Sequence, residues 1–316
     1  MAPTTADEIM LATSYLGLKL AHPFILGASP LTWHIDSVRR VEDGGCAGIV
    51  MHSLFEEQIA HLSYPERFPL GPEEYLEQIR RIKAAVSIPV IGSLNGFGAD
   101  GWLRYGPLIE QAGADALELN VYYLSTSIHD SSADVERQIE TLVRGLKALI
   151  HIPLAVKLSP FYTTLASLAA RLDAAGADGL VLFNRFYQPD IDVEMMEVLP
   201  NIRLSTSADL PLRLRWLAVL SNRVQASLAV TGGVHSPLDG VKALLSGAHA
   251  VQMVSAILQQ GAAHFRIMEQ GLRHWMGRKH HASIETVRGR MKSSSFADPA
   301  AFERASYLRV LQTWRV

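Results

Sequence analysis

The sequence contains very little cysteine: Cys46 is the single one among 316 residues. A lone cysteine excludes an internal disulfide and any metal cluster held by several thiolates. Cys46 stands directly before an apolar stretch, where we expect a small residue of the core. His274, His280 and His281 are close together, but no carboxylate accompanies them at the spacing of metal ligands, so no metal site is predicted.

Long apolar runs and an excess of charge are also missing. No run approaches the ~18 residues that span a bilayer, and the first residues lack the basic-then-apolar pattern of a secretory signal. The net charge of −2, from 29 Lys and Arg against 31 Asp and Glu, gives no electrostatic footprint for nucleic acid or an anionic membrane. We therefore expect a cytoplasmic enzyme that binds neither nucleic acid nor a membrane.

The sequence does contain two interleaved series of short apolar stretches, and members of each series recur 63 to 74 residues apart. A segment of helical length follows each stretch. Eight buried strands that alternate with helices in this way predict a (β/α)8 TIM barrel built from four double units. The first series lies at 22–28, 88–94, 152–158 and 226–232, and the second at 45–51, 113–119, 176–182 and 247–253.

One barrel with additions accounts for the whole length, so we predict a single domain over residues 1–316. Residues 1–12 are expected to be a mobile leader, and residues 15–20 a hairpin under the barrel floor. A helical extension is expected over about 283–316, with Asp298 as the cap of a helix. This extension could seal the barrel or reach a second subunit in a homodimer. It has apolar residues at helical spacing: Phe302, Tyr307, Leu308 and Leu311.

Helical spacing predicts outer helices at 35–43, 72–83, 102–111 and 135–149. Two long connections lack a clear helical pattern. Residues 54–71 are expected to overhang the barrel mouth as a lid. Residues 186–209 form a connection of a length that is usually functional in a compact domain.

The fifth predicted strand carries a lysine, Lys157, at its carboxyl end. Its near-continuous Leu, Ala and Val indicate a strand covered on both faces. A buried ammonium without compensation is costly, so Lys157 should meet a carboxylate, an anion or a ligand oxygen. The alternative is a lysine whose charged end extends to the rim of the barrel.

Polar side chains also follow other predicted strands. His52 comes after the second strand, Asn95 after the third and Asn120 after the fourth. Amides on adjacent strand ends offer paired donors and acceptors, which suit a heterocycle with alternating N–H and C=O groups. We therefore predict a polar pocket at the barrel mouth.

Small residues follow the last two strands. Gly232 and Gly233 end the seventh strand, and Ser255 ends the eighth. Backbone N–H groups after strands seven and eight, with the first turn of a helix behind them, are the usual phosphate site of this barrel. The same mouth is thus expected to hold a phosphate.

A phosphate site, a lysine and several amides at one mouth fit flavin mononucleotide (FMN), with Lys157 at the flavin edge where negative charge accumulates on reduction. They also fit a Schiff-base aldolase that uses Lys157 as nucleophile on a phosphorylated sugar. A third possibility is a flavin-binding subunit that relays electrons to a partner and has no substrate of its own. Spacing alone does not separate these interpretations.

Over roughly residues 15–290, the order of motifs resembles the class 1 dihydroorotate dehydrogenases. The motifs that carry the resemblance lie at 22–24, 28–29, 119–120, 156–158, 184, 231–234 and 247–252. The resemblance implies FMN at the carboxyl face of the barrel. By position, it assigns the flavin contacts to Ala28, Ser29, Ser53, Asn95, Asn120, Lys157, Asn184, Ser205, Thr206, Gly232, Gly233, Val254 and Ser255.

The chain departs from the family pattern at the expected catalytic positions. Tyr123 stands where the family has its cysteine base, and His52 stands where it has a lysine. A phenol of ordinary pKa near ~10 is a poor base at neutral pH but a competent proton donor. We therefore predict a divergent branch that transfers hydride between flavin and a C–C bond of a small acidic heterocycle, dihydroorotate or a relative. The predicted catalytic residues are Tyr123, Lys157 and His52, and the predicted substrate contacts are His52, Asn95, Asn120, Ser125 and Asn184.

Overall fold

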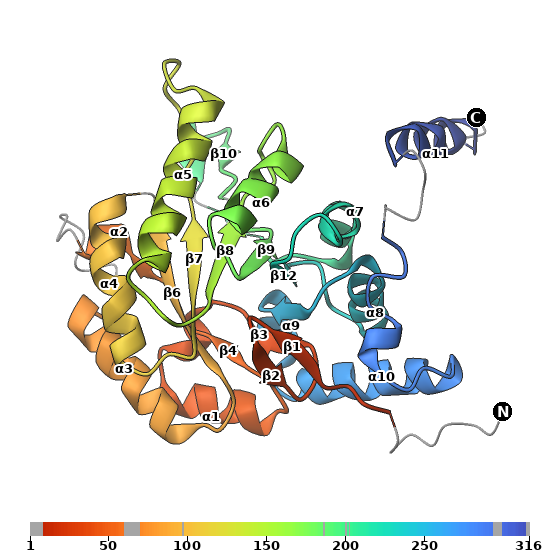
Figure 1. Cartoon of the computed structure of the whole chain (residues 1–316), viewed down its shortest axis with the longest axis horizontal. Coiled ribbons are helices and arrows are strands. Elements are labelled where there is room, and N and C mark those ends of the chain that lie inside the picture. Colours follow the sequence, from red (N-terminus) through yellow and green to blue (C-terminus); the bar gives the residue numbers. More distant parts are fainter. Residues whose placement is uncertain are drawn as a thin grey trace.

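The computed structural model describes residues 9–59, 70–96, 98–185, 187–199, 201, 203–292 and 299–313. Within these residues, eight parallel strands form a closed ring, since the hydrogen-bonded order β4-β3-β13-β12-β9-β8-β7-β6 is completed by pairing of β4 with β6. The prediction of a (β/α)8 barrel is confirmed (Figure 1). The strands are β3 (Phe24–Leu26), β4 (Ile49–Val50), β6 (Val90–Gly96), β7 (Ala116–Val121), β8 (Leu154–Leu158), β9 (Gly179–Leu182), β12 (Ser227–Thr231) and β13 (Ala250–Met253).

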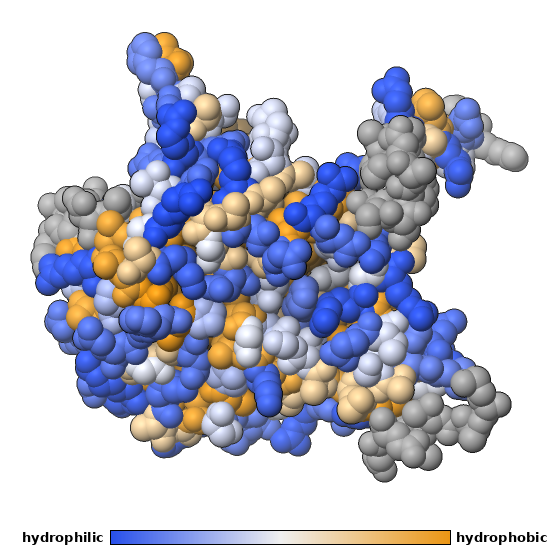
Figure 2. Space-filling model, in the orientation of Figure 1, coloured by the Kyte–Doolittle hydropathy of each residue, from blue (hydrophilic) through white to orange (hydrophobic). Residues whose placement is uncertain are grey.

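Helices surround the strands, and their outer surface is mostly hydrophilic with scattered hydrophobic side chains (Figures 1 and 2). The helix predicted at 135–149 begins three residues earlier, because the Ser131 hydroxyl accepts a hydrogen bond from the Asp134 N–H and caps the first turn. The outer helices are α1 (Ile35–Asp43), α3 (Pro72–Ala85), α4 (Ala99–Gln111), α5 (Ser132–Lys147), α6 (Leu165–Ala174), α7 (Leu210–Leu220), α8 (Pro237–Ser246), α9 (Ser255–Gln260) and α10 (His264–Arg278).

A hairpin of β1 (Thr13–Tyr15) and β2 (Leu18–Leu20) closes the floor of the barrel, as predicted. Tyr15 and Leu16, at the turn of this hairpin, are buried in one apolar cluster with small strand residues. Alanines are needed on the strands because bulkier side chains would occupy the space that the hairpin fills. The alanines of this cluster that lie on strands are Ala116, Ala155, Ala229 and Ala250.

The prediction of a mobile leader over residues 1–12 is wrong for residues 9–12. Ile9 and Leu11 are buried, and Met10 forms a bridge with Ser283. Their apolar side chains gain more from burial against the core than the chain loses in ordering them. Residues 1–8 lie outside the described part of the chain.

The two long connections contain short elements that the helical pattern did not reveal. The predicted lid begins with β5 (Leu54–Phe55) and α2 (Glu56–Ile59), and its residues 60–69 lie outside the described part. The connection after β9 contains an exposed antiparallel hairpin of β10 (Asp190–Asp192) and β11 (Glu197–Leu199). Three-residue strands are too short for an alternating pattern to identify.

The predicted carboxyl-terminal helix is present as α11 (Pro299–Thr313). Its Tyr307, Leu308 and Leu311 side chains are exposed, so this extension does not seal the barrel. Figure 1 shows α11 apart from the ring of outer helices. Among the described residues, no helix is long and apolar enough to cross a membrane.

Candidate functional site

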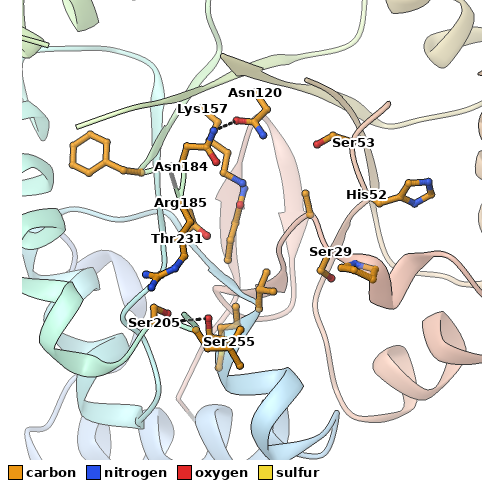
Figure 3. A pocket seen from close by; sticks show the side chains of 18 of the residues that line it. Ser29, His52, Ser53, Asn120, Lys157, Asn184, Arg185, Ser205, Thr231 and Ser255 are labelled. Atoms are coloured by element: carbon orange, nitrogen blue, oxygen red, sulfur yellow. Dashed lines mark hydrogen bonds between the residues drawn. The ribbon is translucent and has the colours of Figure 1, made fainter. Parts of the chain in front are cut away.

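A cavity of about 740 Å³ opens at the carboxyl ends of the strands, which is a volume typical of small-molecule and cofactor sites. Most of the residues predicted from the sequence lie in its wall, and Figure 3 shows several of them around one central space. The predicted residues that line the cavity are Ala28, Ser29, His52, Ser53, Asn95, Asn120, Lys157, Asn184, Ser205, Gly232, Gly233, Val254 and Ser255.

A row of polar side chains crosses three adjacent strands. Asn95 of β6 is in register with Asn120 of β7, which is in register with Lys157 of β8. Residues in register on parallel strands point to the same face, so all three side chains enter the barrel mouth. The row continues to Asn184, whose Nδ2 donates a 2.6 Å hydrogen bond to Asn120 Oδ1. The strands thus present amide donors and acceptors beside a lysine.

Lys157 has a buried partner that the sequence analysis did not identify. Its Nζ lies 3.3 Å from Oε1 of Glu118, and both side chains are almost fully buried. The other oxygen of Glu118, Oε2, accepts a 2.5 Å hydrogen bond from Gln252 Nε2 on β13. The expectation that Lys157 meets a carboxylate is confirmed. Glu118 lies two residues before Asn120 on β7, hence one layer deeper in the barrel.

On the other side of the cavity, hydroxyl groups tie the ends of β12 and β13 to the segment before α7. The Ser205 N–H donates to Ser255 Oγ at 3.0 Å, and the Gly233 N–H donates to Ser205 Oγ at 3.1 Å. A Cβ at residue 233 would lie 2.6 Å from the backbone nitrogen of Leu210, and φ there is +84°. Glycine is therefore required for this close approach. Thr206 is not part of the wall, since it is exposed and its N–H donates to Asp209.

Arg213 of α7 also lines this side, although no motif pointed to it. Only 7% of its surface is exposed. Nε donates to the Thr231 carbonyl oxygen at 2.5 Å, and Nη1 donates to the Asp209 carbonyl oxygen at 2.6 Å. Burial lowers the pKa of Arg213 from the ordinary arginine value. The side chain thus joins α7 to the end of β12 through neutral acceptors.

His52 is held at the edge of the cavity by Thr32. The Thr32 hydroxyl oxygen lies 3.1 Å from His52 Nδ1 and accepts a 2.7 Å hydrogen bond from the His52 N–H. The imidazole also meets the ring of Tyr75 edge-on, with 5.1 Å between centroids. Burial lowers the pKa of His52 to about 4, so this side chain is neutral at pH 7.

The two predicted residues of the loop after β7 lie elsewhere. Tyr123 and Ser125 both donate to Asp130 Oδ2, at 2.8 and 2.6 Å, on an exposed part of the loop. The hydrogen bond to Asp130 raises the pKa of Tyr123. Tyr122, its neighbour, does line the cavity, and its hydroxyl oxygen accepts a 2.9 Å hydrogen bond from the Tyr187 N–H.

The rim of the cavity is more aromatic than the sequence analysis indicated. Trp33, Phe55, Tyr122 and Tyr187 all line it. They follow strands and short helices without a common spacing, so no periodic signal marks them in the sequence. Aromatic faces at a cavity rim favour a flat ligand.

Comparison with known proteins agrees with this geometry. The sequence model of the family described as "Dihydroorotate dehydrogenase" matches residues 69–276. The catalytic subunit of dihydroorotate dehydrogenase B (NAD(+)) from Thermoplasma volcanium is 26% identical over 297 residues, covering 88% of this chain and 97% of that protein. A putative dihydroorotate dehydrogenase A (fumarate) from Aeropyrum pernix is 26% identical over 300 residues, covering 88% and 96%.

A relative with another described activity also matches. The NAD-dependent dihydropyrimidine dehydrogenase subunit PreA of Escherichia coli K12 is 24% identical over 312 residues, covering 88% of this chain and 76% of PreA. The resemblance seen in the sequence motifs is therefore confirmed at the level of the family, by a match that includes β6 to β13 of the barrel. The chain belongs to the dihydroorotate dehydrogenase family.

Proposed function

We propose that the protein is an FMN-dependent oxidoreductase that transfers hydride between flavin and a C–C bond of a small heterocycle, dihydroorotate or a relative. The observation that carries the proposal is the composition of one cavity wall. Asn120 and Lys157 lie on one side, and Ser205 and Ser255 lie on the other (Figure 3). Asn95 extends the polar row, since it is in register with Asn120. Family membership supports the oxidoreductase assignment.

The residues of the wall fit a flavin nucleotide. Among the described residues, the buried Ser29 Oγ and Gln252 Oε1 have no hydrogen-bond partner although both residues line the cavity, as expected of atoms that await a ligand. The small side chain of Ala28 leaves room for a flat ring in the cavity. FMN, when bound, would supply the hydride-transfer chemistry.

Lys157 would hold the edge of the flavin ring where negative charge develops, and Glu118 would keep the ammonium in place. The amides of Asn95, Asn120 and Asn184 would hold the substrate or the ring through donors and acceptors. The segments around Ser205, Gly233 and Ser255 would hold the phosphate. Ser53 and Val254, which are also predicted flavin contacts, line the same cavity.

The proton must be moved by a side chain that reaches the substrate. The sequence assigns this role to Tyr123, but the cavity geometry favours Tyr122, which is in the wall. Tyr123 donates its hydroxyl hydrogen to Asp130 instead. We propose Tyr122 as the first candidate proton carrier and Tyr123 as the second, with Tyr123 requiring the loop to turn inward.

The state of His52 bears on the substrate. A neutral imidazole cannot provide the charge that a lysine at this position would offer to a carboxylate. The relatives include both a dihydroorotate dehydrogenase subunit and a dihydropyrimidine dehydrogenase subunit. Neutral amide-bearing dihydropyrimidines are therefore candidates beside the acidic dihydroorotate.

The Schiff-base alternative is less consistent with the structure. A nucleophilic lysine must be free to approach a carbonyl carbon, whereas Lys157 Nζ is held 3.3 Å from Oε1 of the buried Glu118. Borohydride trapping of a phosphorylated carbonyl compound on Lys157 would restore this alternative. A flavin that no small molecule reduces or oxidises would instead support the electron-relay subunit.

The experiment that tests the proposal is anaerobic mixing of the flavin-loaded protein with dihydroorotate, dihydrouracil or dihydrothymine. We expect at least one of them to bleach the flavin absorbance within the time of a catalytic turnover. The neutral compounds should be favoured if position 52 selects against a carboxylate. If none bleaches the flavin, and orotate and uracil do not reoxidise the reduced protein, the substrate class is wrong.

A further inference from the structure

We propose that Arg213 is a phosphate ligand of this site, so that the protein distinguishes FMN from riboflavin by a side-chain cation on α7. This inference rests on the proposed function, because it takes the ligand to be a flavin phosphate. No sequence motif pointed to Arg213, because the site residues were predicted from the ends of strands and Arg213 lies on a helix, α7.

The position of the guanidinium carries the first part of the argument. A Cβ placed on Gly232 would lie 3.0 Å from Arg213 Nη2 and 3.3 Å from its Cζ, so the planar group lies against the turn after β12. Gly232, Gly233 and Arg213 all line the cavity. The cation is therefore located where the barrel places its phosphate.

The hydrogen bonds of Arg213 give the second part. A guanidinium has five N–H donors, and the contacts found among the described residues use Nε and Nη1, both toward backbone carbonyls. Within the same residues, no carboxylate oxygen lies within 4.0 Å of it as an ion pair would require. The nearest acid along the chain, Asp209, instead has its Oδ1 3.8 Å from Arg185 and its Oδ2 on the Thr206 N–H.

The energetic cost of burial gives the third part. A buried charge without a counter-ion is costly unless a ligand compensates for it. Neutral carbonyls satisfy some of the donors, and the Asp209 carboxylate, which also pairs with Arg185, offsets the positive charge only in part. Lys157, in contrast, has Glu118 as its own counter-ion. A bound phosphate would be the counter-ion of Arg213, as Glu118 is the counter-ion of Lys157.

The backbone N–H groups near Arg213 are already used in hydrogen bonds, so a phosphate needs another donor. The N–H groups of Ser205 and Gly233 already donate to serine hydroxyls. A phosphate that relied on these two amides would have to displace those contacts. Arg213 can bind the dianion through Nη2 while its other nitrogens keep it in place.

The test compares FMN with riboflavin, which has the same ring system and lacks the phosphate. Full-length apoprotein is titrated with each flavin for the wild type, Arg213→Met and Arg213→Lys. We expect Arg213→Met to weaken FMN binding roughly 10- to 100-fold, the usual range for a hydrogen-bonded charge, and to change riboflavin binding less than about twofold. Arg213→Lys should lose less FMN affinity than Arg213→Met, since it keeps the charge but not the fork of donors.

Arg215→Met is the matched control, because Arg215 is on the same helix, is exposed and does not line the cavity. It should leave both affinities unchanged. Equal weakening of FMN and riboflavin by Arg213→Met would mean a structural role, and unchanged FMN affinity would mean no contact; either result overturns the inference. Wild-type protein that binds neither flavin would instead overturn the proposed function, and the inference with it.

A crystal structure of the wild-type FMN complex decides the matter if the Arg213 variants do not fold. A phosphate oxygen at about 3 Å from an Arg213 nitrogen is the expected result. A phosphate that binds only backbone amides and serine hydroxyls, with the guanidinium directed elsewhere, would overturn the inference.

Discussion

Lys157 and Arg213 are two cations of one cavity, and they are buried to nearly the same degree, with 6% and 7% of their surfaces exposed. They differ in their partners. Lys157 pairs with the carboxylate of Glu118, whereas the hydrogen bonds of Arg213 in the described structure go to carbonyl oxygens. One cation thus has a buried carboxylate as its direct partner, and the other does not. Under the proposed function, Lys157 would adjust the reacting ring and Arg213 would hold the phosphate.

The largest expected effect tests the first cation. Lys157→Met leaves the buried Glu118 carboxylate without its counter-ion, and removal of one partner of such a pair costs about 3–5 kcal/mol. Glu118→Gln should also destabilise the protein, and the double variant should be more stable than the sum of the two losses predicts. Urea denaturation of the apoproteins measures the free energy of unfolding.

The exposed pair Arg80 and Glu77 is the control for this cycle, since about half of each side chain is accessible and Arg80→Met should cost less than about 1 kcal/mol. Additive losses in the Lys157 and Glu118 variants would show that the two groups are not coupled. Lys157 would then not differ from Arg213 in having an internal counter-ion.

The next effect concerns proton transfer on the Lys157 side of the cavity. Tyr122→Phe removes the phenol that lines the cavity, and turnover should fall roughly 10²-fold, the usual size of a general acid or base contribution. Tyr123→Phe should reduce turnover only a few-fold, because its hydroxyl hydrogen-bonds to Asp130 on the exposed loop. Both variants should retain FMN.

Anaerobic stopped-flow reduction of the bound flavin gives these rates. The reverse result, with a large loss for Tyr123→Phe and a small one for Tyr122→Phe, would return the role to the residue assigned from the sequence. It would also show that the loop after β7 turns inward during catalysis.

The smallest effect comes from His52, another basic side chain of the wall. Its folded-state pKa of about 4 is below its ordinary value of 6.5, so the unfolded chain binds the proton more readily. Its contribution to stability is fully present above pH 6.5 and is lost as the pH falls toward 4. His52→Gln should therefore lose less stability than the wild type between pH 7 and pH 5, by roughly 1 kcal/mol after allowance for partial exposure.

Thermal melting across this pH range measures the difference. His249, whose pKa burial also lowers to about 4, is the comparison: His249→Gln should flatten the pH profile similarly without changing flavin binding. Identical pH profiles for the wild type and His52→Gln would mean that the pKa of His52 is the same in the folded and unfolded states. Burial would then not hold this side chain neutral below pH 6.5.

The barrel could be predicted because its strands repeat at a regular spacing with a near-constant composition. Strand ends then give the positions of side chains such as Asn120 and Lys157 directly, since parallel strands of a barrel end at the same face. The need of Lys157 for a partner was also predictable from the cost of a buried ammonium. The identity of that partner was not, because Glu118 is in the middle of a mostly apolar strand, β7, and Lys157 is on a different strand.

Other parts of the site depend on geometry that local patterns do not encode. Arg213 is one of two arginines two residues apart on α7, and the sequence does not show which one turns toward β12. Which of Tyr122 and Tyr123 faces the cavity likewise depends on the path of the loop after β7, and a loop has no periodic pattern from which this could be predicted. Such residues are found only once the strand, loop and helix are placed together.

The measurement that tests the central claim most directly is the binding of FMN by the full-length protein. Purified protein is analysed for flavin absorbance and bound flavin, and stripped protein is titrated with FMN. We predict about one noncovalent FMN per chain, with a spectrum that changes on binding as the ring leaves water. Protein that is colourless as purified and shows no spectral change on titration with FMN would contradict the account.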